Sequence, residues 1–520
     1  MVVQGVQMQK DVVIIGGGVA GLTAALHLAE RGLRPFLIEA HPTHIGGRLK
    51  DETAVKLEHQ GRTWTFPGEH GVHGIWSPYV NLKAMLNRHN ILPDFVPAKD
   101  ETWILGQGKR VRKAQIGRTI RGSWVPAPFH YLGLFSRPSF WRMINLRDIA
   151  AMFRLMAGLF TAMSIDPLAE QKALTGMSLA DFTAGWSPTL QSMFAGLSRN
   201  ALAAHPEDVP VAGFISFLRF YTLMRRDAWA FDYLPGPGGS CLSEPLARAA
   251  KNAGVEMQLN GRAAELSQDE SAGGWQIVIE AAGEKQTLLA ADVVLAMDAP
   301  GAHRLLRNSH PTAAAVKSMH FPAGIPTAII RMWFDRQPEG VSESGIFTGN
   351  FVVDNFFWLD RLQSDFIKWR QATGGSAVEM HIYGPPELLA QSDTLLLVQV
   401  AQDVQRAFPE LRGHRLHSII QRNEATHTLF SVGEPGHHLE TKTPWPHLFA
   451  CGDWVYHPSP SLYLERATVT GIAAANALLA GRGQEPWPLL SPLPPEPLAG
   501  WVARQWWRLR QVMLKRQGKA

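Results

Sequence analysis

A glycine-rich turn between an apolar strand and a helix, near the start of the chain, constrains the fold most strongly. Asp11–Ile15 is an apolar run of strand length, and the sequence GGGVAG follows it at residues 16–21. Leu22–Glu30 has the small and apolar residues of a packed helix, and Arg34–Ile38 is a second apolar strand that ends at Glu39. This order of elements predicts the start of a doubly wound α/β domain.

The chemistry of this turn indicates a dinucleotide. Gly16 permits the tight turn, Gly18 lets backbone N–H groups approach a pyrophosphate, and Gly21 lets the helix pack closely. The helix N-terminus adds free N–H donors and the positive end of a dipole. An acid at Glu39 suits a ribose with a free 2′-hydroxyl, which favours FAD or NAD over NADP. The predicted contacts come from Gly16, Gly18, Val19, Ala20, Gly21, Glu39 and Ala40.

Two further segments favour FAD. Gly46-Gly47-Arg48 forms a short loop whose arginine supplies a cation for a pyrophosphate oxygen. Pro446–Asp453 is a short strand that ends in Gly452-Asp453, and Glu465–Leu479 is a helix rich in small residues. A Gly-Asp pair facing a helix N-terminus suits a ribityl chain and a flavin edge, because the helix dipole stabilises negative charge on the reduced ring.

Over its whole length the chain resembles the flavin-containing amine oxidase and phytoene desaturase superfamily. The resemblance rests on the motifs above, on Leu234–Leu266 as the central cofactor segment and on Ala291–Pro300 as the returning strand. It implies an α/β fold, with a Rossmann-type (GR2-like) FAD-binding domain and a discontinuous α+β substrate domain. It also implies cofactor contacts from His70, Gly71, Val72, His73, Ala263, Gly452, Asp453, Glu465, Arg466 and Ala467.

Several phrases resemble carotenoid desaturases, closest to aromatic-ring synthases of the isorenieratene-synthase type. They are EHGVHG at 69–74, YVN at 79–81, RMWFDR at 331–336, DW at 453–454 and PSLYLERA at 460–467. Enzymes of this type dehydrogenate a β-ring and shift a methyl group. The resemblance implies hydride transfer from a hydrophobic polyene to flavin N5, β-ring desaturation with methyl migration, and a membrane quinone as electron acceptor.

Two alternatives stay open. A flavin amine oxidase that uses O2 normally flanks the ring with paired aromatic residues, and Trp454 and Tyr456 would supply such a pair. A carotenoid- or flavin-binding protein without turnover is the other alternative. The spacing of His70 and His73 suits metal ligands, but neither a cysteine cluster nor an H-E-x-x-H motif accompanies it, so we predict no metal site.

The reaction itself needs a proton acceptor or a surface that stabilises a cation. A base removes the proton that accompanies the hydride, and aromatic faces stabilise an allylic cation. The candidate acids and bases are Glu69, Asp354, Glu379 and Glu465, and the candidate substrate-lining residues are Phe356, Phe357, Trp358, Trp454 and Tyr456.

Basic residues interleaved with aromatic ones indicate a membrane-facing surface. Residues 102–147 contain many lysines and arginines and no acid, and Asp148–Met163 continues as an apolar helix too short to span a bilayer. Residues 498–520 repeat the pattern after Glu496, the last acid of the chain. Such stretches suit docking on an anionic lipid surface, whereas no recognition motif for nucleic acid accompanies the charge.

These motifs predict the organisation of the chain. Two cysteines in 520 residues predict no disulfide framework and a reducing compartment, and the N-terminus lacks a signal-peptide pattern. We therefore expect a cytoplasmic, peripheral membrane protein. The predicted parts are a discontinuous FAD-binding domain at 1–105, 234–300 and 445–482, a substrate domain at 106–233 and 301–444, and a proline-rich linker with a basic amphipathic tail at 483–520.

Overall fold

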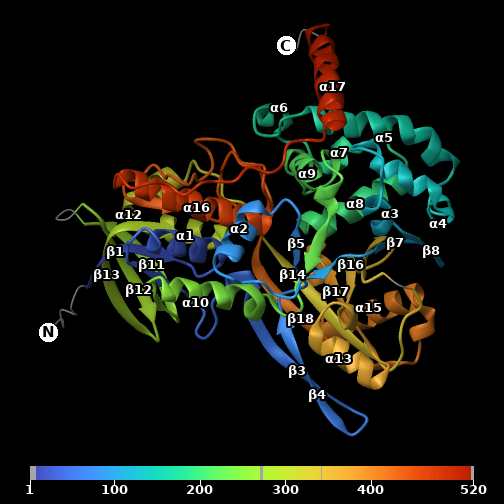
Figure 1. The fold of residues 1–520 in the computed structure, drawn as a ribbon, viewed down its shortest axis with the longest axis horizontal. Helices are drawn as coiled ribbons and strands as arrows, with labels where there is room; N and C mark the ends of the chain where they lie inside the picture. The colour runs from blue at the N-terminus through green and yellow to red at the C-terminus, as the bar shows by residue number, and fades with distance from the viewer. Residues whose placement is uncertain (1–7, 270–272, 341, 517–520) are drawn as a thin grey trace.

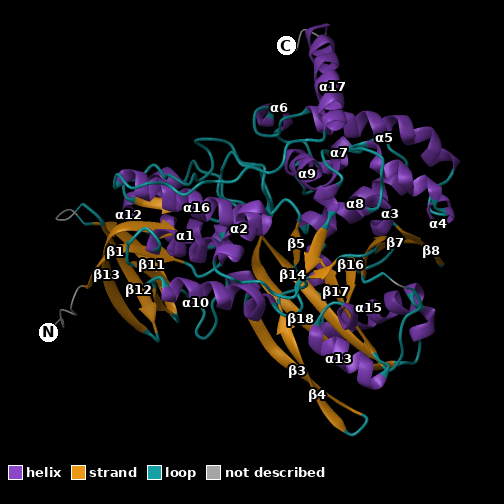
Figure 2. Cartoon of the chain, viewed as in Figure 1, coloured by secondary structure: helices purple, strands orange, loops and turns teal. Residues whose placement is uncertain are grey.

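The computed structural model describes residues 8–269, 273–340 and 342–516 and arranges them around two large sheets (Figures 1 and 2). The first sheet has the order β10-β2-β1-β13-β12-β11, with β19 paired to β13. Residues 1–7 of the predicted flavin domain and 517–520 of the predicted tail lie outside the described residues. The strands are β1 (Met8–Ile15), β2 (Pro35–Ile38), β10 (Glu256–Gln258), β11 (Gly261–Gln268), β12 (Trp275–Ala281), β13 (Glu284–Leu295) and β19 (Leu448–Ala450).

The apolar run of β1 forms the centre of this sheet. It pairs in parallel with β2 on one side and with β13 on the other. Val12 and Ile14 pack in one core, and Val13 and Ile15 pack in another on the opposite face. A strand covered on both faces must be apolar throughout, which explains why its sequence does not alternate with polar residues.

Helices cover both faces of the first sheet (Figure 1). One core contains α1 (Val19–Ala29), α2 (Val80–Arg88), α10 (Glu244–Asn252) and α16 (Tyr463–Gly481), and the other contains α11 (Ala299–Asn308) and α12 (His310–Val316). The helices α1 and α16 pack closely against each other. A Cβ on Gly471 of α16 would lie only 2.6 Å from the carbonyl oxygen of Ala20 in α1, so there is room only for glycine at this position. The small residues of α16 therefore serve helix packing.

The second sheet has the order β18-β14-β17-β16-β15-β7-β8, and α13 and α15 lie beside it in Figure 1. The sequence segments TAIIRMWF at 327–334 and AVEMHI at 377–382 lie in its neighbouring strands β14 and β17. Its members are β7 (Glu101–Gln107), β8 (Arg110–Gln115), β14 (Gly324–Phe334), β15 (Ser344–Gly349), β16 (Asn355–Trp358), β17 (Ser376–Ile382) and β18 (Arg415–Thr428), with α13 (Ser364–Thr373), α14 (Pro386–Leu389) and α15 (Asp393–Ala407).

Smaller strands connect the two sheets. The hairpin of β3 and β4 extends downward in Figure 1, and β5, β9 and β6 form a three-stranded sheet. Their bounds are β3 (Asp51–His59), β4 (Arg62–Glu69), β5 (Gly74–Trp76), β6 (Val96–Pro97) and β9 (Phe231–Tyr233). Since β4 ends at Glu69, the phrase EHGVHG lies at the junction of the sheets.

A helical group lies beside the second sheet, and the C-terminal helix α17 packs on α5 and projects beyond the body (Figure 1). Among the described residues, no helix combines the length and the apolar character needed to cross a bilayer. The helices are α3 (Gly117–Arg121), α4 (Pro138–Trp141), α5 (Leu146–Ser164), α6 (Gln171–Leu174), α7 (Leu179–Phe182), α8 (Pro188–Leu202), α9 (Val211–Leu218) and α17 (Pro497–Arg516).

Candidate functional site

The three glycines of the first turn have different surroundings. Gly16 has φ = +115°, and a Cβ there would lie 2.7 Å from the carbonyl oxygen of Ala296. A Cβ on Gly21 would lie 2.0 Å from the carbonyl oxygen of Gly16. In contrast, a Cβ on Gly18 would meet no described atom within 4 Å. The fold itself requires Gly16 and Gly21, whereas Gly18 borders open space that a ligand can enter.

The N-terminus of α1 faces this space with unused donors. Gly18 is the N-cap, and within the described part of the chain no side chain caps it. The first N–H groups of a helix lack internal partners, so this end suits an anion. Glu39 lies nearby at the end of β2, where its two carboxylate oxygens accept hydrogen bonds from the backbone N–H groups of Gly17 (2.8 Å) and His41 (2.7 Å). Each oxygen keeps a lone pair for a hydroxyl donor.

Segments from both ends of the chain meet at this turn. Gly46 donates its N–H to the carbonyl oxygen of Gly17 at 2.9 Å. Arg48 Nη2 lies 2.5 Å from Asp453 Oδ2, which joins residues 405 positions apart. Gly452 precedes this aspartate with φ = +146°, a conformation that favours glycine. The geometry therefore combines a free helix end, an acid and a cation around Gly18, and this donor set fits a dinucleotide such as FAD.

Residues 70–73, which follow β4, are hydrogen-bonded to the second sheet. Val72 donates its N–H to Glu379 Oε1 at 2.8 Å, and Asn423 Nδ2 donates to the carbonyl oxygen of His70 at 3.0 Å. Gly71 has φ = +148°, and a Cβ there would lie 3.2 Å from His381 Cε1. Residues 70–73 therefore lie directly against β17 and β18.

Arg331 lies at the centre of this junction. The buried guanidinium binds Glu379 Oε2 through Nε at 2.7 Å and the carbonyl oxygen of Pro67 through Nη1 at 2.8 Å. Burial acts to raise the pKa of Glu379, but Arg331 and His381 together lower it to about 2. Burial raises the pKa of Glu69, whose side chain accepts a hydrogen bond from Gln363. The structure thus brings two of the four candidate carboxylates to one place and shifts their pKa values in opposite directions.

Neutral imidazoles lie near Arg48. Burial, with help from His73 and Arg48, lowers the pKa of His70 to about 3. Burial and Arg48 also lower the pKa of His427 to about 4. At neutral pH these rings are therefore uncharged.

A family model described as flavin containing amine oxidoreductase matches residues 19–479. The chain belongs to this family. It is a flavin-dependent oxidoreductase, and its cofactor is FAD.

Relatives of this flavin-dependent oxidoreductase cover most of its length. It is 26% identical over 491 residues to a carotenoid phi-ring synthase of Streptomyces griseus, with 92% of this chain and 89% of the relative covered. It is 24% identical to a carotenoid phi-ring synthase of Chlorobaculum tepidum, with 92% and 90% covered. Cyclohexylamine oxidase from Brevibacterium oxydans shares the fold with a TM-score of 0.64 at 16% identity, and covers 91% of this chain and 100% of its own.

Glu465 and Arg466 have structural contacts in the oxidoreductase. Glu465 Oε1 accepts hydrogen bonds from the backbone N–H and Nδ2 of Asn81, both at 2.8 Å, and Oε2 accepts from Leu82 N at 3.0 Å. Arg466 donates to carbonyl oxygens of the preceding loop, including that of Val455 at 2.9 Å. These contacts tie α16 to the start of α2 and to the loop after β19.

The predicted aromatic lining is only partly brought to the junction. Phe356 and Trp358 are buried in a core on the second sheet, where both rings pack against the ring of Phe408. Phe357 points the other way, because neighbouring residues of a strand face opposite sides, and its ring centroid lies 5.2 Å from that of His381. Trp454 packs behind the glycine loop and donates Nε1–H to the carbonyl oxygen of Met297 at 2.9 Å. Two of the predicted trio and Trp454 are thus core residues rather than lining.

Tyr456 also lies away from this junction. It is partly buried, and its backbone N–H donates to the carbonyl oxygen of Leu439 at 2.9 Å. Two residues of this region were not predicted from the sequence, His381 and Tyr383. In the segment AVEMHIY at 377–383 they follow Glu379 at every second position, so their side chains point to the same side of the chain as that of Glu379. The period of two in that phrase was the available signal.

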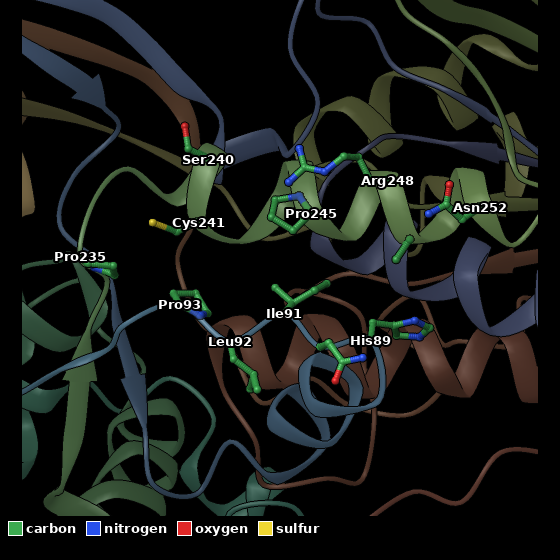
Figure 3. A pocket seen from close by; sticks show the side chains of 12 residues that line it. His89, Ile91, Leu92, Pro93, Pro235, Ser240, Cys241, Pro245, Arg248 and Asn252 are labelled. Carbon is green, nitrogen blue, oxygen red and sulfur yellow. The ribbon is translucent and has the colours of Figure 1, made fainter.

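A pocket of about 540 Å³ lies elsewhere, between α10 and the loop that follows α2. Figure 3 shows Pro245, Arg248 and Asn252 on α10 facing His89 and Leu92 across it. Its lining comes from the outer side of α10, so this pocket is separate from the glycine turn.

Proposed function

We propose that this flavin-dependent oxidoreductase dehydrogenates a carotenoid, with an end ring as the reacting group and methyl migration as part of ring aromatisation. The observation that carries the proposal is the similarity to two carotenoid phi-ring synthases over about nine tenths of each chain. The likeness to amine oxidases is below 20% identity and supports the fold alone.

In this proposal the segments 1–105, 234–300 and 445–482 form the FAD-binding domain, and 106–233 and 301–444 form the substrate domain. Bound FAD supplies a hydride acceptor at N5. The α1 N-terminus and Arg48 would hold the pyrophosphate, Glu39 would hold the ribose, and residues 70–73 would line the ring. The residues proposed to hold the cofactor are Gly16, Gly18, Val19, Ala20, Gly21, Glu39, Ala40, Gly46, Gly47, Arg48, His70, Gly71, Val72, His73, Ala263, Gly452, Asp453 and Ala467. Glu465 and Arg466 are left out because their side chains bind α2 and the loop after β19.

The substrate side of the site excludes water and orients an apolar chain. Phe357 offers an aromatic face beside His381, and such a face stabilises positive charge that develops on a polyene. Arg331 fixes the position of residues 67–72 against the second sheet, so the reacting carbon is held between two rigid surfaces.

The proposal includes docking on a membrane, where a carotenoid and a quinone electron acceptor both reside. Large apolar side chains of α5 are exposed, with Leu146 at 84% and Phe153 at 80%, next to the exposed Arg147 and Arg154. Apolar side chains with flanking arginines suit an anionic lipid surface, into which such side chains insert. The helix α17 presents a similar face.

Pigment analysis of a carotenoid-producing host tests the proposal. Expression of the chain should convert the host carotenoid to a product with an aromatic end ring, detected by its absorption spectrum and mass. A Gly18→Val variant, designed to exclude FAD, serves as the control and should leave the pigment unchanged. Unchanged pigment with the wild-type protein, together with peroxide release from soluble amines, would contradict the proposal and favour an amine oxidase.

A further inference from the structure

Side chains of β14 and β17 form a continuous hydrogen-bonded chain from a buried cation to a tyrosine hydroxyl. Arg331 Nε lies 2.7 Å from Glu379 Oε2, and Glu379 Oε1 lies 2.8 Å from His381 Nε2. His381 Nδ1 lies 2.7 Å from Tyr383 Oη. Glu379, His381 and Tyr383 are alternate residues, so their side chains leave the strand on one side.

We propose that Tyr383, His381 and Glu379 form the relay that accepts the proton removed from the carbon substrate, with the Tyr383 hydroxyl as the group that meets it. This inference rests on the proposed dehydrogenation and assigns its proton-accepting residues. His381 acts through Tyr383, and Glu379 and Arg331 are positioning residues.

For a neutral His381 imidazole, the hydrogen-bond partners select one tautomer. Glu379 is ionised, since Arg331 and His381 outweigh the effect of burial and hold its pKa at about 2. A carboxylate only accepts hydrogen bonds, so His381 Nε2 carries the proton that is donated to Glu379. His381 Nδ1 is then a bare lone pair that accepts from Tyr383 Oη–H. The imidazole is thus held in the tautomer that can take a proton from the tyrosine.

The Tyr383 hydroxyl oxygen has one lone pair free to accept a proton from the substrate. Tyr383 Oη donates to His381 and accepts one hydrogen bond from Asn355 Nδ2 at 3.2 Å. A hydroxyl has two acceptor lone pairs, so one is left. Burial raises the pKa of Tyr383, and the hydroxyl therefore keeps its own proton until His381 takes it.

The relay lies against the segment proposed to line the flavin. Glu379 Oε1 accepts the N–H of Val72 at 2.8 Å, and His381 Cε1 lies 3.2 Å from where a Cβ on Gly71 would be. Phe357 also packs beside the imidazole, with ring centroids 5.2 Å apart. A substrate held beside residues 71–72 is therefore next to the relay.

Bound FAD would supply the two-electron acceptor for a hydride that leaves one carbon of the substrate with its electron pair. The C–H bond on the adjacent carbon breaks, its electron pair forms the new double bond, and its proton passes to Tyr383 Oη. The tyrosine proton moves to His381 Nδ1, and the resulting imidazolium is stabilised by the Glu379 carboxylate. The relay resets when this proton passes to solvent.

Other titratable groups face the relay from the neighbouring elements. Asp354 Oδ2 accepts the backbone N–H of Tyr383 at 2.7 Å, and Asp354 Oδ1 lies 2.8 Å from Arg199 Nη1 of α8. His205, which follows α8, lies 3.4 Å from where a Cβ on Gly384 would be. From the β4 side, Glu69 and His73 approach with Oε2 and Nδ1 3.9 Å apart. Burial raises the pKa of Glu69 and of Asp354 above the ordinary value of a carboxyl group.

The test compares Tyr383→Phe with Tyr233→Phe in the full-length, FAD-loaded protein. Tyr233 is also a buried tyrosine, with its hydroxyl bonded to Ser344 Oγ at 2.8 Å, but it is outside the relay. We expect Tyr383→Phe to lower kcat for carotenoid dehydrogenation roughly 10²- to 10⁴-fold with KM and FAD content unchanged. Tyr233→Phe should keep the wild-type kcat.

The pH dependence separates a relay from a purely structural role. Wild-type kcat should fall on acidification, because protonated His381 cannot accept a proton. In His381→Gln, kcat should be low and this acidic limb should be lost. ¹⁵N-histidine NMR of the FAD-loaded protein gives a readout that does not depend on turnover. The His381 signal is identified as the one that the His381→Gln variant lacks. In the wild type we expect this signal to be that of an imidazole protonated at Nε2 and unprotonated at Nδ1.

The outcomes distinguish the two proposals. If wild-type protein leaves both the carotenoid and the flavin absorption at 450 nm unchanged under anaerobic mixing, the proposed function fails and the relay with it. If the wild type turns over and Tyr383→Phe or His381→Gln matches it in kcat and pH profile, the relay alone is overturned.

Discussion

At the scale of single residues, Gly18 and Gly21 lie in one turn but differ in the space that surrounds them. Gly18 has φ = −72° and ψ = 179°, which any residue adopts, and its Cβ would meet no described atom within 4 Å. We predict that Gly18→Val leaves the melting temperature of the apoprotein unchanged but weakens FAD binding about 100-fold, equivalent to about 2.7 kcal/mol, because the side chain fills the pyrophosphate position. Flavin absorbance after gel filtration and titration of apoprotein with FAD measure this.

Gly21→Val is the matched control for that prediction. Its Cβ would lie 2.0 Å from a backbone oxygen of Gly16, so the turn and α1 must shift. We expect a loss of about 3 kcal/mol in stability with or without FAD. If Gly18→Val retains FAD as tightly as the wild type, the glycine turn does not bind the pyrophosphate.

For single residues, the sequence alone predicts most of the residues proposed to bind the cofactor but few of those proposed to face the substrate. The residues of GGGVAG are contiguous, so their roles follow from local geometry. The roles of Phe357 and His381 depend on which side of a strand faces residues 70–73, and that depends on pairing between strands far apart in sequence. The aromatic trio was therefore predicted as one unit, although its members alternate between two sides of β16.

At the scale of elements, the packing of α1 on α16 sets a limit on side-chain size. A Cβ on Gly471 would lie 2.6 Å from the carbonyl oxygen of Ala20 and 2.9 Å from Thr23 Cβ. We predict that Gly471→Val separates the helices and costs about 2–3 kcal/mol in stability. Gly481 ends the same helix, where a Cβ would meet no described atom within 4 Å.

Gly481→Val should change stability by less than about 0.5 kcal/mol, because the substitution is at an open surface position. Thermal unfolding followed by circular dichroism compares the two variants. Equal melting temperatures would contradict the close packing of α1 on α16. The small residues of α16 were visible in the sequence, but the partner helix was not, since α1 lies more than 400 positions earlier.

At the scale of the whole molecule, exposed apolar residues occur on several of the described helices, among them α17 and α15 as well as α5. On α17, Leu509, Val512 and Met513 are 46%, 48% and 44% exposed, and on α15 Leu395 and Val398 are 46% and 48% exposed. Only α17 carries these residues among exposed arginines and lysines without any acid. Exposure alone therefore does not identify the docking surface, but exposure combined with positive charge does.

We predict that the triple variant Leu509→Ser, Val512→Ser and Met513→Ser loses about 3 kcal/mol of membrane affinity, roughly a 100-fold fall in partitioning, because each side chain contributes about 1 kcal/mol on insertion. Sedimentation with vesicles that contain anionic lipid measures this. The control variant Leu395→Ser and Val398→Ser removes two side chains of similar exposure from α15 and should sediment as the wild type does. Since lipid attraction of the basic residues is screened by salt, wild-type binding should also weaken as ionic strength rises. Equal sedimentation of the α17 and α15 variants would show that the projecting helix does not dock.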